Sequence, residues 1–254
     1  MQKREGNRRH LVSGGKPFYG EAIGILLNKT TTPLLPGNVG NASTYKFPVR
    51  MENIESFPCD WWCDQEGASQ RRLIDFIEAA RELEKRGVRA ITTGCGYYAV
   101  FQKEASQALN VPLFTSPLLL VPMVSSTIGQ KRKVGILVSG SKHLDHSFLR
   151  NVGINESIPI AIQGMEEMGE FSAVYNFETK QIADIELLES EIVSAAKTLV
   201  AQNPEVGAIV LECSDMPPFS RAIQETVKLP VFDFITMINM VYEAVVKQSY
   251  IGFM

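Results

Sequence analysis

Short apolar runs alternate with longer amphipathic segments along most of the chain. A run of about six apolar residues is typical of a strand in a buried parallel sheet, whereas apolar residues at three- and four-residue steps predict an amphipathic helix. These patterns predict strands at 22–27, 88–93, 111–115, 133–138, 158–162, 206–211 and 229–233, and helices at 70–86, 97–109, 118–128, 142–151, 177–201, 218–227 and 235–247. The alternation of strand and helix predicts an α/β fold with parallel sheets.

The second half of the chain repeats the pattern of the first half. Cys95 and Cys213 each follow a predicted strand, and an apolar-Pro-apolar-Phe strand follows each cysteine at the same distance. The runs 22–27 and 133–138 also correspond, because each has a glycine at its third position. We interpret the repeat as an internal duplication that gives two pseudo-symmetric, doubly wound lobes with a cleft between them.

The pattern divides the chain into an arm and two lobes. Residues 1–20 are expected to form a flexible N-terminal arm, because they include many basic residues and lack the apolar core of a signal peptide. The first lobe is expected to comprise 21–117 and the final segment 234–254, whose helix packs back on it, and the second lobe 118–233. The long segment 34–66 is expected to be a functional loop or to carry small elements.

Composition and charge exclude several classes of partner. The net charge of −3 gives no reason to expect a nucleic acid or an acidic membrane surface. The longest apolar segment, 111–123, is interrupted by three prolines and does not predict a membrane span. Without a secretion signal the protein is expected to be cytoplasmic, with its four cysteines as reduced thiols.

The two cysteines at equivalent strand ends are the candidate catalytic residues. Ligands of doubly wound sheets bind beyond the carboxyl ends of the strands, so Cys95 and Cys213 are expected to face one ligand from opposite lobes. A helix start after each cysteine favours the thiolate. One thiolate could remove a proton beside a carboxylate while the other thiol returns a proton from the opposite face, which needs no cofactor. The alternative is that both are small buried residues, as free cysteines often are.

Small and polar residues near the strand ends or in the long loop are candidates to bind a substrate carboxylate. Each is also typical of a cap or a turn. Thr93 and Ser214 are the stronger candidates because they flank the thiols. The complete set of candidate substrate-binding residues is Asn28, Asn41, Thr93, Gly96, Ser139 and Ser214.

Three motifs carry a resemblance to a known family. They are Gly-Ile-Leu-Leu at 24–27, Thr-Gly-Cys-Gly at 93–96 and Glu-Cys-Ser at 212–214. With the strand after each cysteine, they make the sequence similar to the aspartate/glutamate/hydantoin racemase superfamily over nearly the whole chain. The resemblance implies cofactor-independent racemisation or epimerisation of a small carboxylate-bearing substrate, such as an amino acid or a derivative, with Cys95 and Cys213 as the acid/base pair.

The sequence departs from that family beside both cysteines. Glutamate and aspartate racemases typically have Asn-Thr after the first cysteine and Thr after the second, where this chain has Gly96-Tyr97 and Ser214-Asp215. The resemblance also covers a cysteine-dependent cis–trans isomerase of unsaturated diacids and a decarboxylase of malonates. These two activities and a non-catalytic small-molecule-binding module stay open as alternatives to the racemase.

The segment around Cys59 and Cys63 is the remaining motif. A lone pair of cysteines without a second ligand pair is a weak zinc signal, so no metal site is expected and the segment is interpreted as an aromatic loop. If Trp61 and Trp62 in this loop are exposed, they provide an interface for a homodimer.

Overall fold

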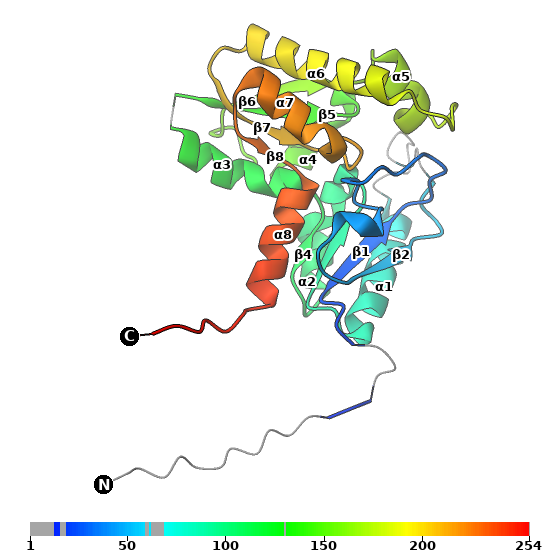
Figure 1. The fold of residues 1–254 in the computed structure, drawn as a ribbon. Helices are drawn as coiled ribbons and strands as arrows, with labels where there is room; N and C mark the ends of the chain where they lie inside the picture. Colours follow the sequence, from blue (N-terminus) through cyan, green and yellow to red (C-terminus); the bar gives the residue numbers. More distant parts are fainter. Residues whose placement is uncertain (1–12, 16–18, 59–60, 62–68, 130, 254) are drawn as a thin grey trace.

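The fold consists of two four-stranded parallel sheets, one in each half of the chain (Figure 1). The computed structural model describes residues 13–15, 19–58, 61, 69–129 and 131–253. The strand orders are β2-β1-β3-β4 and β6-β5-β7-β8, so the two sheets share one topology. The strands are β1 (Ile23–Leu27), β2 (Val49–Asn53), β3 (Ala90–Thr93), β4 (Leu113–Phe114), β5 (Lys133–Val138), β6 (Ile160–Gly164), β7 (Val206–Leu211) and β8 (Val231–Phe232). The predicted α/β fold with two lobes is confirmed.

The helices cover the sheets and carry the chain between parallel strands. They are α1 (Gln70–Arg86), α2 (Gln102–Gln107), α3 (Val121–Ile128), α4 (His146–Asn151), α5 (Gly169–Phe171), α6 (Ile185–Gln202), α7 (Ser220–Val227) and α8 (Phe234–Val245). The last helix, α8, packs against β3 of the first sheet, as the sequence predicts. No helix in the described residues is long and apolar enough to cross a membrane.

The duplicated glycines explain how each long helix packs on its sheet. A Cβ atom on Gly24 of β1 would lie 2.9 Å from Leu83 of α1, and a Cβ on Gly135 of β5 would lie 2.9 Å from Leu199 of α6. Both contacts are closer than real side chains allow. The same absence of a side chain therefore lets α1 and α6 approach the central strands of the two sheets.

Several elements differ from the prediction: the helices expected at 97–109 and 118–128 begin as 3-10 helices, and the helix expected at 142–151 is α-helical only from His146. The long segment 34–66 contains an edge strand, β2, whose half-buried residues lack the apolar run of a central strand. The helix predicted at 177–201 begins only at Ile185, because Asp184 caps it by accepting a hydrogen bond from the Leu187 N–H. Ile182, which the periodicity places on the buried face, is 81% exposed. A π-helical turn at 172–176 precedes this segment.

The boundaries of the arm and the lobes stay predictions. Most of the predicted arm, 1–20, lies outside the described residues, as do Cys59, Cys63 and Trp62. Trp61 is described and is 1% exposed, so the expectation that it offers an exposed dimer interface is wrong. Its indole stacks on Tyr98 and Phe101 and therefore belongs to the core.

The two lobes share an apolar core and are joined by polar contacts. The largest cluster of buried apolar residues continues from the first sheet to β5 and β7 of the second. The Tyr97 hydroxyl, on the first lobe, accepts a hydrogen bond from the Gly140 N–H and donates to the Gly140 carbonyl, both at 2.8 Å. The Asn151 amide of the second lobe donates to the Val100 carbonyl at 2.9 Å. These contacts fix the lobes relative to each other.

Replacing Tyr97 with Phe tests the junction between the lobes. The variant leaves the N–H and the carbonyl of Gly140 without the Tyr97 hydroxyl as hydrogen-bond partner. We therefore expect the free energy of unfolding to fall by about 1–3 kcal/mol. Urea unfolding followed by circular dichroism measures it. Tyr175→Phe is the matched control, because that hydroxyl makes one long contact of 3.5 Å with the Pro33 carbonyl. Equal losses in the two variants would contradict the assignment.

Candidate active site

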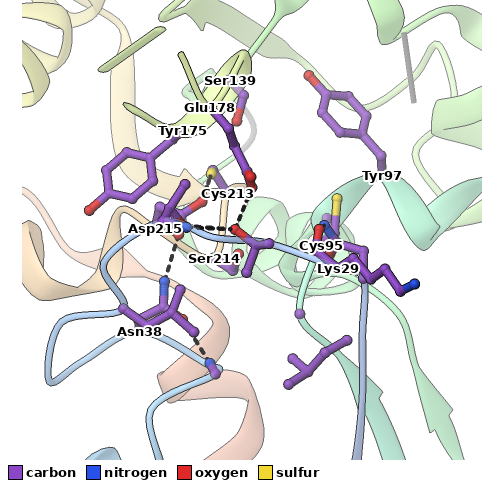
Figure 2. A pocket seen from close by; sticks show the side chains of 18 of the residues that line it. Lys29, Asn38, Cys95, Tyr97, Ser139, Tyr175, Glu178, Cys213, Ser214 and Asp215 are labelled. Carbon is purple, nitrogen blue, oxygen red and sulfur yellow. Dashed lines mark hydrogen bonds between the residues drawn. The ribbon is translucent and has the colours of Figure 1, made fainter. Parts of the chain in front are cut away.

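A cavity of about 590 Å³ lies at the carboxyl ends of the central strands of both sheets. Both cysteines face it, Cys95 after β3 and Cys213 after β7 (Figure 2). Asn28 to Thr32 line it from the loop after β1, and Ser139 lines it from the segment after β5. Tyr175 and Asn176 of the π-helical turn and Glu178 just after that turn complete this side of the cavity. The prediction that the two thiols face one cleft is therefore confirmed as geometry.

Cys95 is held at a turn between β3 and a short 3-10 helix at Gly96–Phe101. The Gly94 N–H donates to the Leu26 carbonyl at 2.8 Å and keeps the turn in register with β1. The Thr93 hydroxyl donates to the Thr115 carbonyl and has the Cys95 carbonyl at 3.1 Å. The turn thus fixes a half-buried thiol at the cavity wall.

Cys213 is buried and sits in a polar network. Its thiol donates to Asp215 Oδ2 at 3.4 Å, and Asp215 Oδ1 accepts from the Asn38 amide at 2.6 Å (Figure 2). Asn38 is 3% exposed, and its side-chain oxygen Oδ1 accepts a hydrogen bond from the Gly40 N–H at 2.7 Å. A residue of the long 34–66 segment therefore crosses to the second lobe and orients the carboxylate beside the thiol.

The environment favours the protonated form of both thiols and of Glu212 and Asp215. Burial raises the pKa of Cys95 and of Cys213 well above 9, and the nearby carboxylates of Glu212 and Asp215 raise both further. The Tyr97 N–H acts in the opposite sense on Cys95, and the Ser139 hydroxyl and the Asp215 N–H do so on Cys213, because these donors stabilise the thiolates. Burial also raises the pKa of Asp215 to about 6.

Glu212 is the most deeply buried of these acids. It is 0% exposed, and neither carboxyl oxygen has a hydrogen bond of normal geometry within the part of the chain that the structure describes. The Ser139 N–H lies close enough to favour the ionised form, but burial outweighs it and raises the pKa of Glu212 to about 8. The alternation of side chains along a strand predicts that Glu212 points to the opposite face from Cys213. The structure places it in the cavity wall.

The structure brings four of the six predicted substrate-binding residues to the cavity. Asn28, Gly96, Ser139 and Ser214 line it. Asn41 does not line it. The side-chain oxygen of Asn41 caps the 42–44 turn, and its side-chain NH2 donates to the Leu34 carbonyl at 2.8 Å. Thr93 does not line it either, because its buried hydroxyl is used by the turn that carries Cys95. Asn41 is therefore a local cap, and Thr93 ties its strand to the segment after β4, so neither residue lines the cavity.

A contact between the lobes closes the rim of the cavity. Glu178, which follows the π-helical turn, accepts hydrogen bonds from the Thr31 N–H at 3.1 Å and the Thr31 hydroxyl at 3.0 Å, and also from the Thr30 hydroxyl (Figure 2). Glu178 has a left-handed φ of 48°. Sequence reasoning missed Glu178, Asn38 and Asp215, because each functions through a partner far away along the chain.

The sequence is similar to curated algal enzymes. It is 31% identical over 206 residues to a dimethylsulfoniopropionate lyase of Durusdinium sp. clade D, covering 79% of this chain and 67% of that protein. It is 28% identical over 234 residues to dimethylsulfoniopropionate lyase 5 of Emiliania huxleyi, covering 88% of this chain and 45% of that protein. The chain thus spans between about half and two thirds of these relatives. No protein-family model matches it.

Solved structures of low sequence identity share the fold. An unliganded arylmalonate decarboxylase superposes with a TM-score of 0.56 at 14% identity, covering 90% of this chain and 94% of that one. An allantoin racemase from Klebsiella pneumoniae superposes with a TM-score of 0.59 at 13% identity, covering 88% and 87%. At these identities the comparison concerns the arrangement of the sheets and helices alone.

The stability of the protein is expected to fall with rising pH because of Glu212. Its folded pKa of about 8 lies above the ordinary 4.5, so the folded state keeps a proton that the unfolded chain loses. The resulting stabilisation is complete below pH 4.5 and is lost as the pH rises through 8. Between pH 5 and 8 we expect the wild type to lose on the order of 4 kcal/mol more than Glu212→Gln. Urea unfolding at several pH values measures this difference, and parallel pH profiles would contradict it.

Proposed function

The chain belongs to the family of dimethylsulfoniopropionate lyases, within the aspartate/glutamate/hydantoin racemase superfamily, and from this membership we propose that it cleaves dimethylsulfoniopropionate or a close sulfonium carboxylate. It is an enzyme of that superfamily. The observation that carries the proposal is the pair of thiols, Cys95 and Cys213, in the wall of one cavity with the Tyr97 N–H as a hydrogen-bond donor beside Cys95.

The reaction is an elimination that begins with removal of a proton next to the carboxylate. The base takes the proton, and the electron pair of that C–H bond forms the new carbon–carbon double bond. The carbon–sulfur bond breaks with its electron pair on sulfur, so neutral dimethyl sulfide leaves. The products are dimethyl sulfide, acrylate and the protonated base, and no oxidant or reductant is consumed.

Cys95 is the residue that we assign as the base. The Tyr97 N–H stabilises its thiolate, whereas the Cys213 thiol donates its hydrogen to the Asp215 carboxylate. When substrate binds, the Cys213 S–H turns from Asp215 to the substrate carboxylate and donates to the charge that develops there. The two residues therefore keep the base and acid roles that the duplication predicts, on a different substrate.

The racemase and epimerase interpretation stays a prediction. Racemisation and elimination share their first step, the removal of a proton beside a carboxylate. They differ in the second step: a leaving group on the next carbon is expelled in elimination, whereas the second thiol returns a proton in racemisation. Whether the substrate carries a leaving group on the next carbon therefore decides which reaction follows. The same site can remove the proton in both.

Substitution of the thiols tests the proposed mechanism. We expect Cys95→Ser to lower kcat/KM for dimethylsulfoniopropionate by roughly 10²–10⁴-fold, because the serine hydroxyl ionises far less readily than a thiol and supplies almost no base. We expect Cys213→Ser to lower it at least roughly tenfold through the lost acid. Gas chromatography of released dimethyl sulfide gives the rates, with Ser190→Ala on the exposed face of α6 as control. Full activity in both cysteine variants would exclude the mechanism.

The pH dependence of the rate is a second test. Because burial and neighbouring carboxylates raise the pKa of the Cys95 thiol, little thiolate is present in the free enzyme at neutral pH. We expect kcat/KM to rise steadily between about pH 7 and 9, since this parameter reports the pKa of groups in the free enzyme. A profile that is flat over this range would show that the base is already ionised.

Deuterium incorporation separates the lyase from a racemase. In D2O a racemase introduces deuterium beside the carboxylate of amino acids, hydroxy acids or hydantoins without breaking the skeleton. The lyase instead releases dimethyl sulfide and monodeuterated or undeuterated acrylate. Mass spectrometry of a mixed substrate pool measures both. Exchange in an amino acid without any release of dimethyl sulfide would overturn the lyase and favour the racemase.

A further inference from the structure

Glu212 has no role in the proposed proton transfer. It is fully buried in the cavity wall, and both of its carboxyl oxygens lack a hydrogen bond of normal geometry among the described residues. A buried acid of this kind is costly, because the polar atoms have lost water without gaining a partner. A ligand in the cavity that supplies the missing interaction would remove the cost.

Gly96 makes room for this carboxyl group. A Cβ on Gly96 would lie 2.2 Å from Glu212 Oε1 and 2.4 Å from the Glu212 carbonyl oxygen. Gly96 does not have a left-handed φ, so the backbone conformation does not require a glycine there. The close approach does require one, and it places the Glu212 carboxyl group directly beside the residue that follows Cys95.

The cavity has an excess of acidic groups. Glu178, Glu212 and Asp215 line it, and Lys29 is the one Lys or Arg among its described lining residues. The Lys29 amine pairs with Glu55 at 2.5 Å, and its side chain is 55% exposed. Glu178 and Asp215 have hydrogen-bond donors of their own, so Glu212 is the acid whose charge is left without a partner among the described lining residues.

We propose that Glu212 is the counter-charge for a methylated onium group of the substrate, and that it selects substrates with a permanent positive charge on the leaving group. The inference rests on the proposed function, in which that onium group is the dimethylsulfonium. Glu212 binds the charged sulfur while the thiols act on the neighbouring carbon. The charge on the leaving group then determines which carboxylates the site accepts.

A methylated onium group fits this environment better than a primary ammonium group. Its methyl groups donate no ordinary hydrogen bonds, so the ion is satisfied by a negative charge and by apolar contacts. Leu27 and Leu34 and the ring of Tyr175 line the same cavity and supply such contacts. Aromatic faces also attract methylated cations directly.

Binding of the cation also acts on the thiols. In the cavity without substrate, burial keeps Glu212 protonated at neutral pH, because its pKa is about 8. A positive sulfonium next to Glu212 favours the carboxylate and balances its charge. The paired charges then spare the Cys95 thiolate the repulsion that an unpaired Glu212 carboxylate would exert.

The test compares three non-reactive carboxylates by isothermal titration calorimetry. 3-(Trimethylammonio)propionate carries the methylated cation, 4,4-dimethylpentanoate is its neutral counterpart in shape, and 3-aminopropionate carries an ammonium with N–H donors. We expect the wild type to bind the methylated cation roughly ten- to a hundredfold more tightly than the neutral acid. Glu212→Gln should lose this preference, and Glu212→Asp, which keeps the charge, should retain part of it.

Glu189→Gln on the exposed face of α6 is the matched control, because it removes the same charge far from the cavity. Circular dichroism establishes that each variant is folded.

Three results would overturn the inference: equal binding of the cationic and neutral acids by the wild type, an unchanged preference in Glu212→Gln, or tighter binding of 3-aminopropionate than of the methylated cation. Release of dimethyl sulfide is a separate measurement, and it tests the lyase proposal rather than the onium site. A wild type that prefers the methylated cation through Glu212 but releases no dimethyl sulfide would refute the lyase and support the onium site.

Discussion

The desolvation of several acidic groups in one cavity is the constraint on which the site depends. Cys95, Cys213, Glu212 and Asp215 all line one cavity, and burial raises the pKa of each. A thiol that must act as a base is poorly served by such surroundings. The chemistry therefore needs compensation from specific donors, such as the Tyr97 N–H, and from the charge of the substrate.

The duplicated fold is what allows this concentration of acids. Two sheets with the same strand order direct the carboxyl ends of their central strands to one space, so each lobe supplies a cysteine from an equivalent position. The junction between the lobes must then be tight enough to keep water out. The Tyr97 hydroxyl paired with both groups of Gly140, and Asn38 paired with Asp215, provide polar contacts that span it.

Local patterns in the sequence predicted the parts of the structure that depend on local forces. The apolar runs and the duplication predicted both sheets and both thiols, and the periodicity of 70–86 predicted helix α1 with its observed ends. The residues that sequence reasoning misplaced depend on contacts that no periodicity reveals. Asn41 is a residue type that can bind a carboxylate, but its side chain caps the turn at 42–44. The side chain of Asn38, by contrast, reaches Asp215 of the other lobe. Trp61 was expected at an exposed interface, yet it stacks within the aromatic core.

The pairing of two thiols with a buried carboxyl group also explains how one fold can host racemisation and elimination. Both reactions need an acidified C–H bond next to a carboxylate and a thiolate aimed at it. Elimination adds the requirement for a leaving group, and a sulfonium leaves as a neutral molecule. In our proposal Glu212 attracts the cation in the bound substrate but not the neutral sulfide, so this attraction weakens as the carbon–sulfur bond breaks. The proposed site therefore gains selectivity from Glu212 at some expense in the barrier to bond cleavage. That expense is smallest when proton removal runs ahead of carbon–sulfur cleavage, because the sulfur then keeps most of its charge in the transition state.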